Sequence, residues 1–135
     1  MKTLTVKAKI YNLSRVLAFI NKELDSARCS KKCIFQIDVA VEELFVNIAN
    51  YAYAPGSGDV TIGITVSGDP AVAEITLLDS GVPYDPVAKS DPDVTLDAEK
   101  RTIGGLGIFM VKQSMDEMLY ERRDDLNLTT IRKRI

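Results

Sequence analysis

The sequence predicts an α+β fold of two layers, in which a mixed, mostly antiparallel sheet carries helices on one face. Three observations lead to this prediction. Apolar residues alternate with polar ones in several short segments, as in half-buried strands. Apolar residues at helical spacing mark three other segments. The strands follow one another as hairpins more often than they alternate with helices, which favours antiparallel pairing.

The first half of the chain is expected to contain a strand, two helices and a hairpin. Ser67-Gly68-Asp69-Pro70 supplies the turn of the hairpin, and Pro55-Gly56-Ser57-Gly58 ends the second helix. The predicted elements are a strand over 3–10, a helix from Asn12 or Ser14 to about Ala27, a helix over about 31–53, and strands over about 60–66 and 72–78.

The second half begins with a long polar segment. Residues 80–103 contain three prolines and many acidic residues but few large apolar ones. A loop longer than about 15 residues in a compact domain is usually functional, often as a lid. A helix over about 105–118 follows, and two short strands near 119–123 and 128–135 flank Asp124-Asp125.

Composition limits the class of protein. The chain has 135 residues, enough for one domain over 1–135, and a net charge of −2, which gives no general attraction to nucleic acid or to an anionic membrane. It shows neither a signal peptide nor an apolar run long enough to span a bilayer, so we expect a cytoplasmic protein. Cys29 and Cys33 are expected to be reduced thiols, and the lack of histidine excludes this residue as phosphoacceptor, nucleophile or base.

The second predicted helix carries an unusual polar strip. Glu43, Asn47 and Asn50 follow at i, i+4 and i+7 on a helix that is otherwise apolar on more than one face. Such a strip is either a solvated edge or a functional surface, because unpaired buried polar groups are costly. Asp38 and Glu42 form another pair at i, i+4, which we expect on the solvent face.

A second candidate is Asp79-Ser80-Gly81, at the end of the strand over 72–78. A carboxylate there can accept a hydrogen bond from an exocyclic amine such as that of adenine, and Gly81 permits a flat ring to approach the backbone closely. The alternative is an ordinary Asp-Ser-Gly turn.

The third candidate is Gly104-Gly105-Leu106-Gly107, which opens the last predicted helix. The free N–H groups and the dipole of a helix N-terminus favour anions such as phosphate. The segment is neither a Walker A motif nor a dinucleotide fingerprint, because the required lysine and the preceding strand are missing. The alternative is a hinge for the loop before it.

In this order the three segments resemble the N, G1 and G2 boxes of the GHKL ATPase superfamily, whose fold is the Bergerat-type two-layer sandwich. The resemblance covers essentially the whole chain and is closest to the anti-sigma-factor serine/threonine kinases. It rests on VEELFVNIANYAY over 41–53, DSGVPYDP over 79–86 and GGLGIFMVKQSMDEMLYE over 104–121. Two positions depart from the family pattern: Tyr51 stands where many relatives have histidine, and Ile103 where a glycine is common.

The resemblance implies a role for each candidate residue. Glu43 is the general base, Asn47 the Mg²⁺ ligand and Asp79 the adenine reader. Residues 85–103 are the ATP lid, in which Lys100 or Arg101 either meets the γ-phosphate or is simply solvated. The cofactor-binding set is Asn47, Asn50, Asp79, Gly81, Gly104, Gly105, Leu106, Gly107 and Thr130.

The resemblance also implies a function. We expect a cytoplasmic kinase that binds ATP and Mg²⁺, binds a sigma factor and phosphorylates a STAS-type anti-sigma antagonist, with a homodimer as one arrangement and neither nucleic acid nor membrane as a partner. One alternative is an ATP-dependent protein-binding regulator without phosphotransfer. Another is a detached ATPase domain of a sensor kinase, which is disfavoured because the chain has no histidine to accept phosphate.

Overall fold

The computed structural model describes residues 1–87 and 105–135. The helices are a short 3-10 turn (Ile10–Asn12), α1 (Leu13–Ser26), α2 (Lys31–Asn47), which continues as a π-helical turn (Ile48–Ala52), and α3 (Gly105–Ser114). The strands are β1 (Lys2–Lys7), β2 (Asp59–Ser67), β3 (Val72–Asp79), β4 (Glu117–Arg123) and β5 (Leu126–Arg134). This order of elements confirms the predicted α+β fold.

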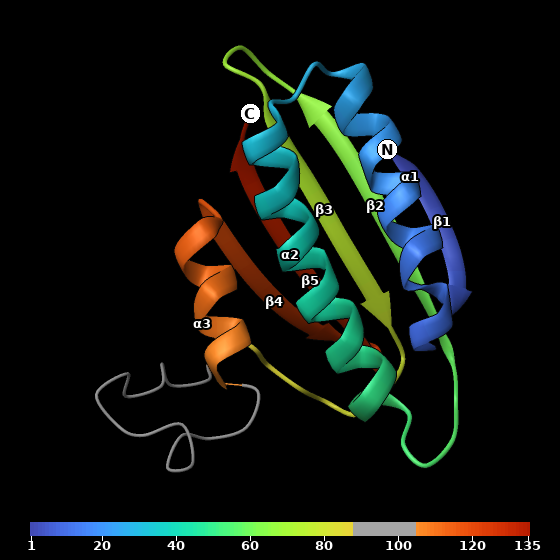
Figure 1. The fold of residues 1–135 in the computed structure, drawn as a ribbon. Coiled ribbons are helices and arrows are strands. Elements are labelled where there is room, and N and C mark those ends of the chain that lie inside the picture. Colours follow the sequence, from blue (N-terminus) through green and yellow to red (C-terminus); the bar gives the residue numbers. More distant parts are fainter. Residues whose placement is uncertain (88–104) are drawn as a thin grey trace.

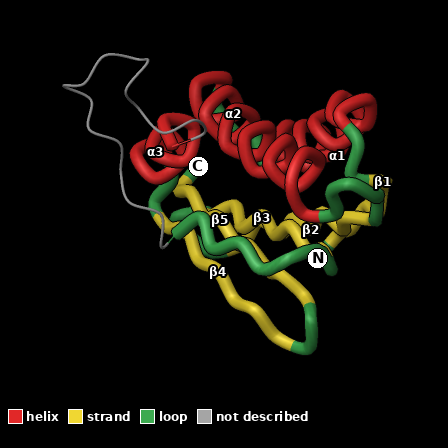
Figure 2. Tube along the Cα trace, turned by 90° about the horizontal axis from the view of Figure 1, so that it is seen from below, coloured by secondary structure: helices red, strands yellow, loops and turns green. Residues whose placement is uncertain are grey.

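The five strands form one sheet in the order β1-β2-β3-β5-β4, and every neighbouring pair is antiparallel. Over the described residues the sheet is therefore antiparallel throughout, which corrects the predicted mixed sheet. The three α-helices lie on the same side of this sheet (Figure 1). Seen from below, they form one layer and the strands form the other (Figure 2).

The hydrophobic core fills the space between these two layers. Each fully buried large apolar side chain contributes about 1.5–3 kcal/mol to folding, so the interlocked core holds α2 firmly over the sheet. Ser30 caps the start of α2, because its hydroxyl accepts a hydrogen bond from the Cys33 N–H at 3.2 Å. The largest fully buried side chains include Phe45, Ile20, Leu24, Ile37, Ile62, Ile75, Leu77, Ile108 and Ile131.

A polar contact between α1 and α2 corrects one expectation. Asp38 is half-buried rather than solvent-facing, and the Asn21 side chain donates a hydrogen bond to its Oδ1 at 2.6 Å. Burial raises the pKa of the Asp38 carboxyl above its usual value, although the bond from Asn21 opposes this shift. Glu42 is exposed, as expected. The periodicity of α2 alone does not reveal which flank α1 covers.

The C-terminal elements also begin and end at different residues than predicted. Helix α3 ends at Ser114, and Met118, the last residue of the predicted helix, belongs to β4. Asp124 and Asp125 have φ values of 51° and 64° and form the two-residue turn between β4 and β5. Left-handed residues in such a turn match the twist of the two strands. Pairing along this hairpin explains why β4 begins before the predicted position.

Candidate functional site

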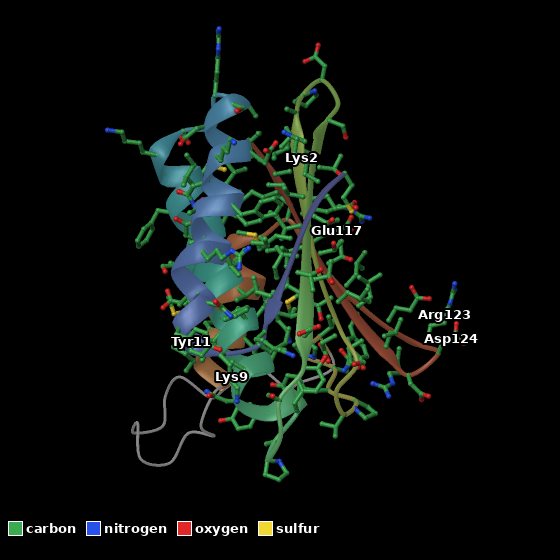
Figure 3. The ribbon with its side chains drawn as sticks, turned by 90° about the vertical axis from the view of Figure 1, so that its right-hand side faces the viewer. Lys2, Lys9, Tyr11, Glu117, Arg123 and Asp124 are labelled. Atoms are coloured by element: carbon green, nitrogen blue, oxygen red, sulfur yellow. The ribbon has the colours of Figure 1, made fainter. Side chains whose placement is uncertain are left out.

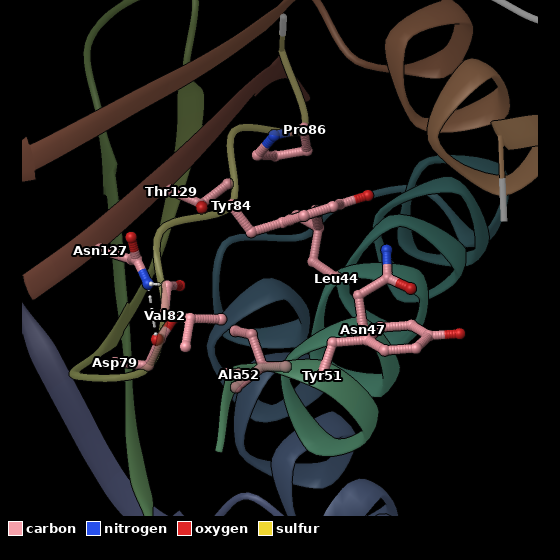
Figure 4. Close-up of a pocket in the computed structure, with 11 residues that line it drawn as sticks. Leu44, Asn47, Tyr51, Ala52, Asp79, Val82, Tyr84, Pro86, Asn127 and Thr129 are labelled. Carbon is pink, nitrogen blue, oxygen red and sulfur yellow. Dashed lines mark hydrogen bonds between the residues drawn. The ribbon is translucent and has the colours of Figure 1, made fainter. Parts of the chain in front are cut away.

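A pocket lies between the C-terminal end of α2 and the segment that follows β3 (Figure 4). Its cavity has a volume of about 30 Å³, which is smaller than the range of about 300–1,000 Å³ common for small-molecule sites. The pocket joins the polar strip of α2 to the turn after β3, two segments that the sequence singled out. It is lined by Leu44, Asn47, Ile48, Tyr51, Ala52, Asp79, Val82, Tyr84, Pro86, Asn127 and Thr129.

Asp79 ends β3 with only 5% of its surface exposed. Its Oδ1 accepts two hydrogen bonds, from the Gly81 N–H at 2.9 Å and from Asn127 Nδ2 at 2.9 Å. The other carboxylate oxygen, Oδ2, accepts no hydrogen bond from any residue that the structure describes. Because an ionised carboxylate only accepts, Asp79 can receive an N–H group of a ligand in the pocket.

Asn127 is part of this site as well, although it was not among the predicted residues. Asn127 is 3% exposed and lies directly opposite Asp79 in the β3–β5 register. Its amide oxygen accepts from the Tyr120 hydroxyl at 2.5 Å and from Arg122 Nη1 at 3.1 Å. A signal was present in the sequence, since an amide at an inward position of an apolar strand needs partners.

Asn47 presents an amide to the same pocket from the last turn of α2. Its Nδ2 is buried and finds no hydrogen-bond partner within the described residues. A buried amide without a partner costs about 1–3 kcal/mol, so a partner outside the chain would relieve this cost. The amide oxygen of the same group is a suitable ligand for a hard cation such as Mg²⁺.

Glu43 lies one helical turn before Asn47 and contacts the start of α3. A Cβ added to Gly107 would lie 2.1 Å from both Cδ and Oε1 of Glu43, so the carboxylate occupies the space beside this glycine. Gly107 belongs to the first turn of α3, where the helix dipole is positive. The fold therefore brings the carboxylate and the glycine-rich segment together.

Gly81 is needed for a different reason than the sequence suggested. It does not line the pocket, and a Cβ added there would lie 2.3 Å from the carbonyl oxygen of Ala52. The adjacent Val82 N–H donates to this oxygen at 2.9 Å, and Arg122 Nη1 donates to the Gly81 carbonyl at 2.7 Å. Gly81 thus permits two segments of backbone to pack closely.

Two predicted pocket residues lie elsewhere. Thr130 pairs with Thr76 and faces the other side of the sheet, while Thr129 lines the pocket. Side chains alternate along a strand, and one residue changes the face. Asn50 is exposed and does not line the pocket, whereas Tyr51, at i+4 from Asn47, does.

The remaining predicted residues are described only in part. Gly105 begins α3, as expected, whereas Gly104 and most of the predicted lid, with Lys100 and Arg101, lie outside the described residues. Leu106 lies in the first turn of α3. In the described ranges 1–87 and 105–135, no group of three or more acidic, cysteine or histidine residues is arranged to hold a metal ion. None of the helices there is long and apolar enough to cross a membrane.

The fold is that of a histidine kinase-like ATPase. Residues 6–133 match the family described as "Histidine kinase-like ATPase domain", and the chain belongs to this family. It is similar to the serine/threonine-protein kinase BtrW of Bordetella bronchiseptica, with 26% identity over 104 residues, or 77% of this chain and 72% of the relative. It is also similar to the serine-protein kinase RsbW of Listeria monocytogenes, with 29% identity over 94 residues. That match covers 66% of this chain and 59% of the relative, so it spans less than two thirds of the length of RsbW.

Proposed function

We propose that this protein binds ATP and transfers its γ-phosphate to a serine or threonine of a protein partner. The observation that carries the proposal is the contact of Glu43 with Gly107, which sets a carboxylate against the first turn of α3 beside the pocket. A module that only binds nucleotide has no need of a carboxylate at this place. Two similar proteins named as protein kinases support the same activity.

In this proposal the pocket orients the nucleotide. Asp79 Oδ2 accepts a hydrogen bond from the exocyclic amine of adenine. No described residue donates a hydrogen bond to this oxygen. The N–H groups at the start of α3, around Gly105 and Gly107, receive phosphate oxygens. Leu106 lies between these two glycines.

Glu43 acts as the general base and takes the proton from the attacking hydroxyl. Asn47 supplies an oxygen ligand to Mg²⁺, and the ion neutralises charge on the triphosphate when it is bound. Asn47 Nδ2 has no partner in the described part of the chain and, as a donor, would find an acceptor in a phosphate or water oxygen. Phosphate and water oxygens supply the other ligands, since a single amide is a weak site.

The partners follow from the anti-sigma branch that the sequence resembles. The protein binds a sigma factor in one state and phosphorylates a STAS-type antagonist in another, with homodimerisation as part of the proposal. Whether phosphate is transferred separates this proposal from that of a nucleotide-dependent binding module with the same fold.

The test replaces Glu43 by glutamine. Glu43→Gln is expected to bind ATP within about threefold of the unchanged protein and to lose phosphotransfer by about 10²–10⁴-fold, the usual contribution of a general base. Transfer is measured with γ-labelled Mg-ATP and a STAS-domain protein from the same organism. Glu42→Gln is the matched control, because Glu42 is the exposed neighbour on the same helix. Normal transfer by Glu43→Gln contradicts the assignment of the base.

A further inference from the structure

A chain of hydrogen bonds runs from Arg122 through Asn127 to Asp79. Arg122 determines which atom of the Asn127 amide faces it. Arg122 Nη1 donates to Asn127 Oδ1 at 3.1 Å, and a guanidinium group has donors only. The side-chain atom of Asn127 that faces Arg122 is therefore the oxygen. The Tyr120 hydroxyl donates to the same oxygen at 2.5 Å.

The other end of the Asn127 amide is fixed as well. Its Nδ2 donates to Asp79 Oδ1 at 2.9 Å and to the Val82 carbonyl at 2.9 Å, and both partners accept only. The partners of the amide oxygen thus all donate, and the partners of the amide nitrogen all accept. All four of its hydrogen-bond positions are used while the residue is only 3% exposed.

This arrangement sets the plane of the Asp79 carboxylate. The terminal torsion of an aspartate is broad and nearly two-fold, so the side chain alone does not decide which oxygen faces the pocket. Two donors, the Gly81 N–H and Asn127 Nδ2, converge on Oδ1. Oδ2 is left as the acceptor for a ligand.

We infer that Asn127, held by Arg122, is the positioning residue that makes Asp79 a fixed acceptor and so selects a purine with an amino group at C6 over one with a carbonyl there. The inference rests on the proposed function, since it names how that site recognises its nucleotide. A carbonyl oxygen at C6 would face Oδ2, and because both atoms only accept, neither would have a donor to replace the water it lost.

The experiment compares the affinities for ATP and inosine triphosphate, which carries a carbonyl at C6, by calorimetry with Mg²⁺. The unchanged protein is expected to prefer ATP by about tenfold or more, the worth of a hydrogen bond to a charged group. In Asn127→Leu, Asp79 Oδ1 keeps only the bond from the Gly81 N–H, so the carboxylate turns more easily and the preference falls by about tenfold. Arg122→Met lowers the preference too, whereas Arg122→Lys keeps most of it, because lysine also only donates.

Arg123→Met is the matched control. Arg123 follows Arg122 on the opposite face of β4, is 77% exposed in its side chain and pairs with Glu121 at 2.8 Å. It stands at the turn after β4, at the edge of the molecule (Figure 3). The preference for ATP should be unchanged in this variant.

The outcomes separate this inference from the proposed function. Melting curves show whether each variant folds, and the Arg122 variants test the inference even if Asn127→Leu does not fold. If the variants lose ATP and inosine triphosphate affinity by the same factor, Asn127 has only a structural role and the inference is overturned. Equal binding of both nucleotides by the unchanged protein also overturns it but leaves nucleotide binding intact. If the unchanged protein binds neither, the proposed function itself fails, and this inference with it.

Discussion

Replacing Gly107 by alanine should impair phosphotransfer without destabilising the protein. The new Cβ would lie 2.1 Å from Cδ and Oε1 of Glu43, whereas ordinary contacts begin at about 3.4 Å. The helix backbone of α3 is held by its own hydrogen bonds, and the Glu43 side chain is flexible. The carboxylate is therefore the part that moves, by more than an ångström.

The rate of transfer should fall, whereas the free energy of unfolding should not. Misplacing a reacting group by about 1 Å can cost about 10²-fold in rate, so we expect a loss of this order in the rate of transfer. Alanine is better than glycine inside a helix by about 1 kcal/mol, so the free energy of unfolding should stay the same or rise slightly. A loss of activity in a stable protein is the signature of the displaced carboxylate.

Gly81→Ala is the matched comparison, because the same substitution there meets backbone instead of a side chain. The added Cβ would lie 2.3 Å from the Ala52 carbonyl oxygen, which cannot move without shifting the end of the π-helical turn. Overpacking of this kind costs about 1–3 kcal/mol of stability. Urea unfolding measures this loss, and a labelled-phosphate assay measures transfer by both variants.

The reasoning is refuted if Gly107→Ala transfers phosphate at the normal rate. It is also refuted if Gly107→Ala unfolds as easily as Gly81→Ala, because the clash would then fall on the fold and not on a movable side chain. Structure determination of the variant would show whether the carboxylate has moved.

Two further predictions concern Asp79 and Cys29. Asp79→Asn should keep the fold and lose most ATP affinity, because one acceptor of the pocket becomes an amide, and unchanged affinity by calorimetry contradicts the adenine-reading role. Burial, with the neighbouring Cys33 thiol as a smaller cause, raises the pKa of the Cys29 thiol from 9.0 to about 11. The unfolded chain therefore loses this proton at lower pH, and stability should fall as pH rises from about 9 to about 11. Cys29→Ser should show a shallower fall in urea unfolding across that range, and an equal fall in both proteins would show that the thiol contributes nothing.

The elements were predictable wherever one periodic pattern determined them. The alternation over 60–66 and 72–78 predicted β2 and β3, and the Asp124-Asp125 turn predicted the last hairpin. The end of α2 was not predictable in the same way, because a π-helical turn changes the phase without leaving a mark in the apolar pattern.

By itself, the sequence determined the fold class, the family resemblance and the candidate residues Glu43, Asn47 and Asp79, because each lies within one element or turn with a recognisable local pattern. Only the tertiary structure decided how these residues meet. The β3–β5 register puts Asn127 opposite Asp79 and turns Thr129, not Thr130, toward the pocket. Register and helix packing depend on contacts between distant parts of the chain, and periodicity within one segment does not contain them. The packing also shows that the glycines at 81 and 107 make room for the Ala52 backbone and for the carboxylate of Glu43.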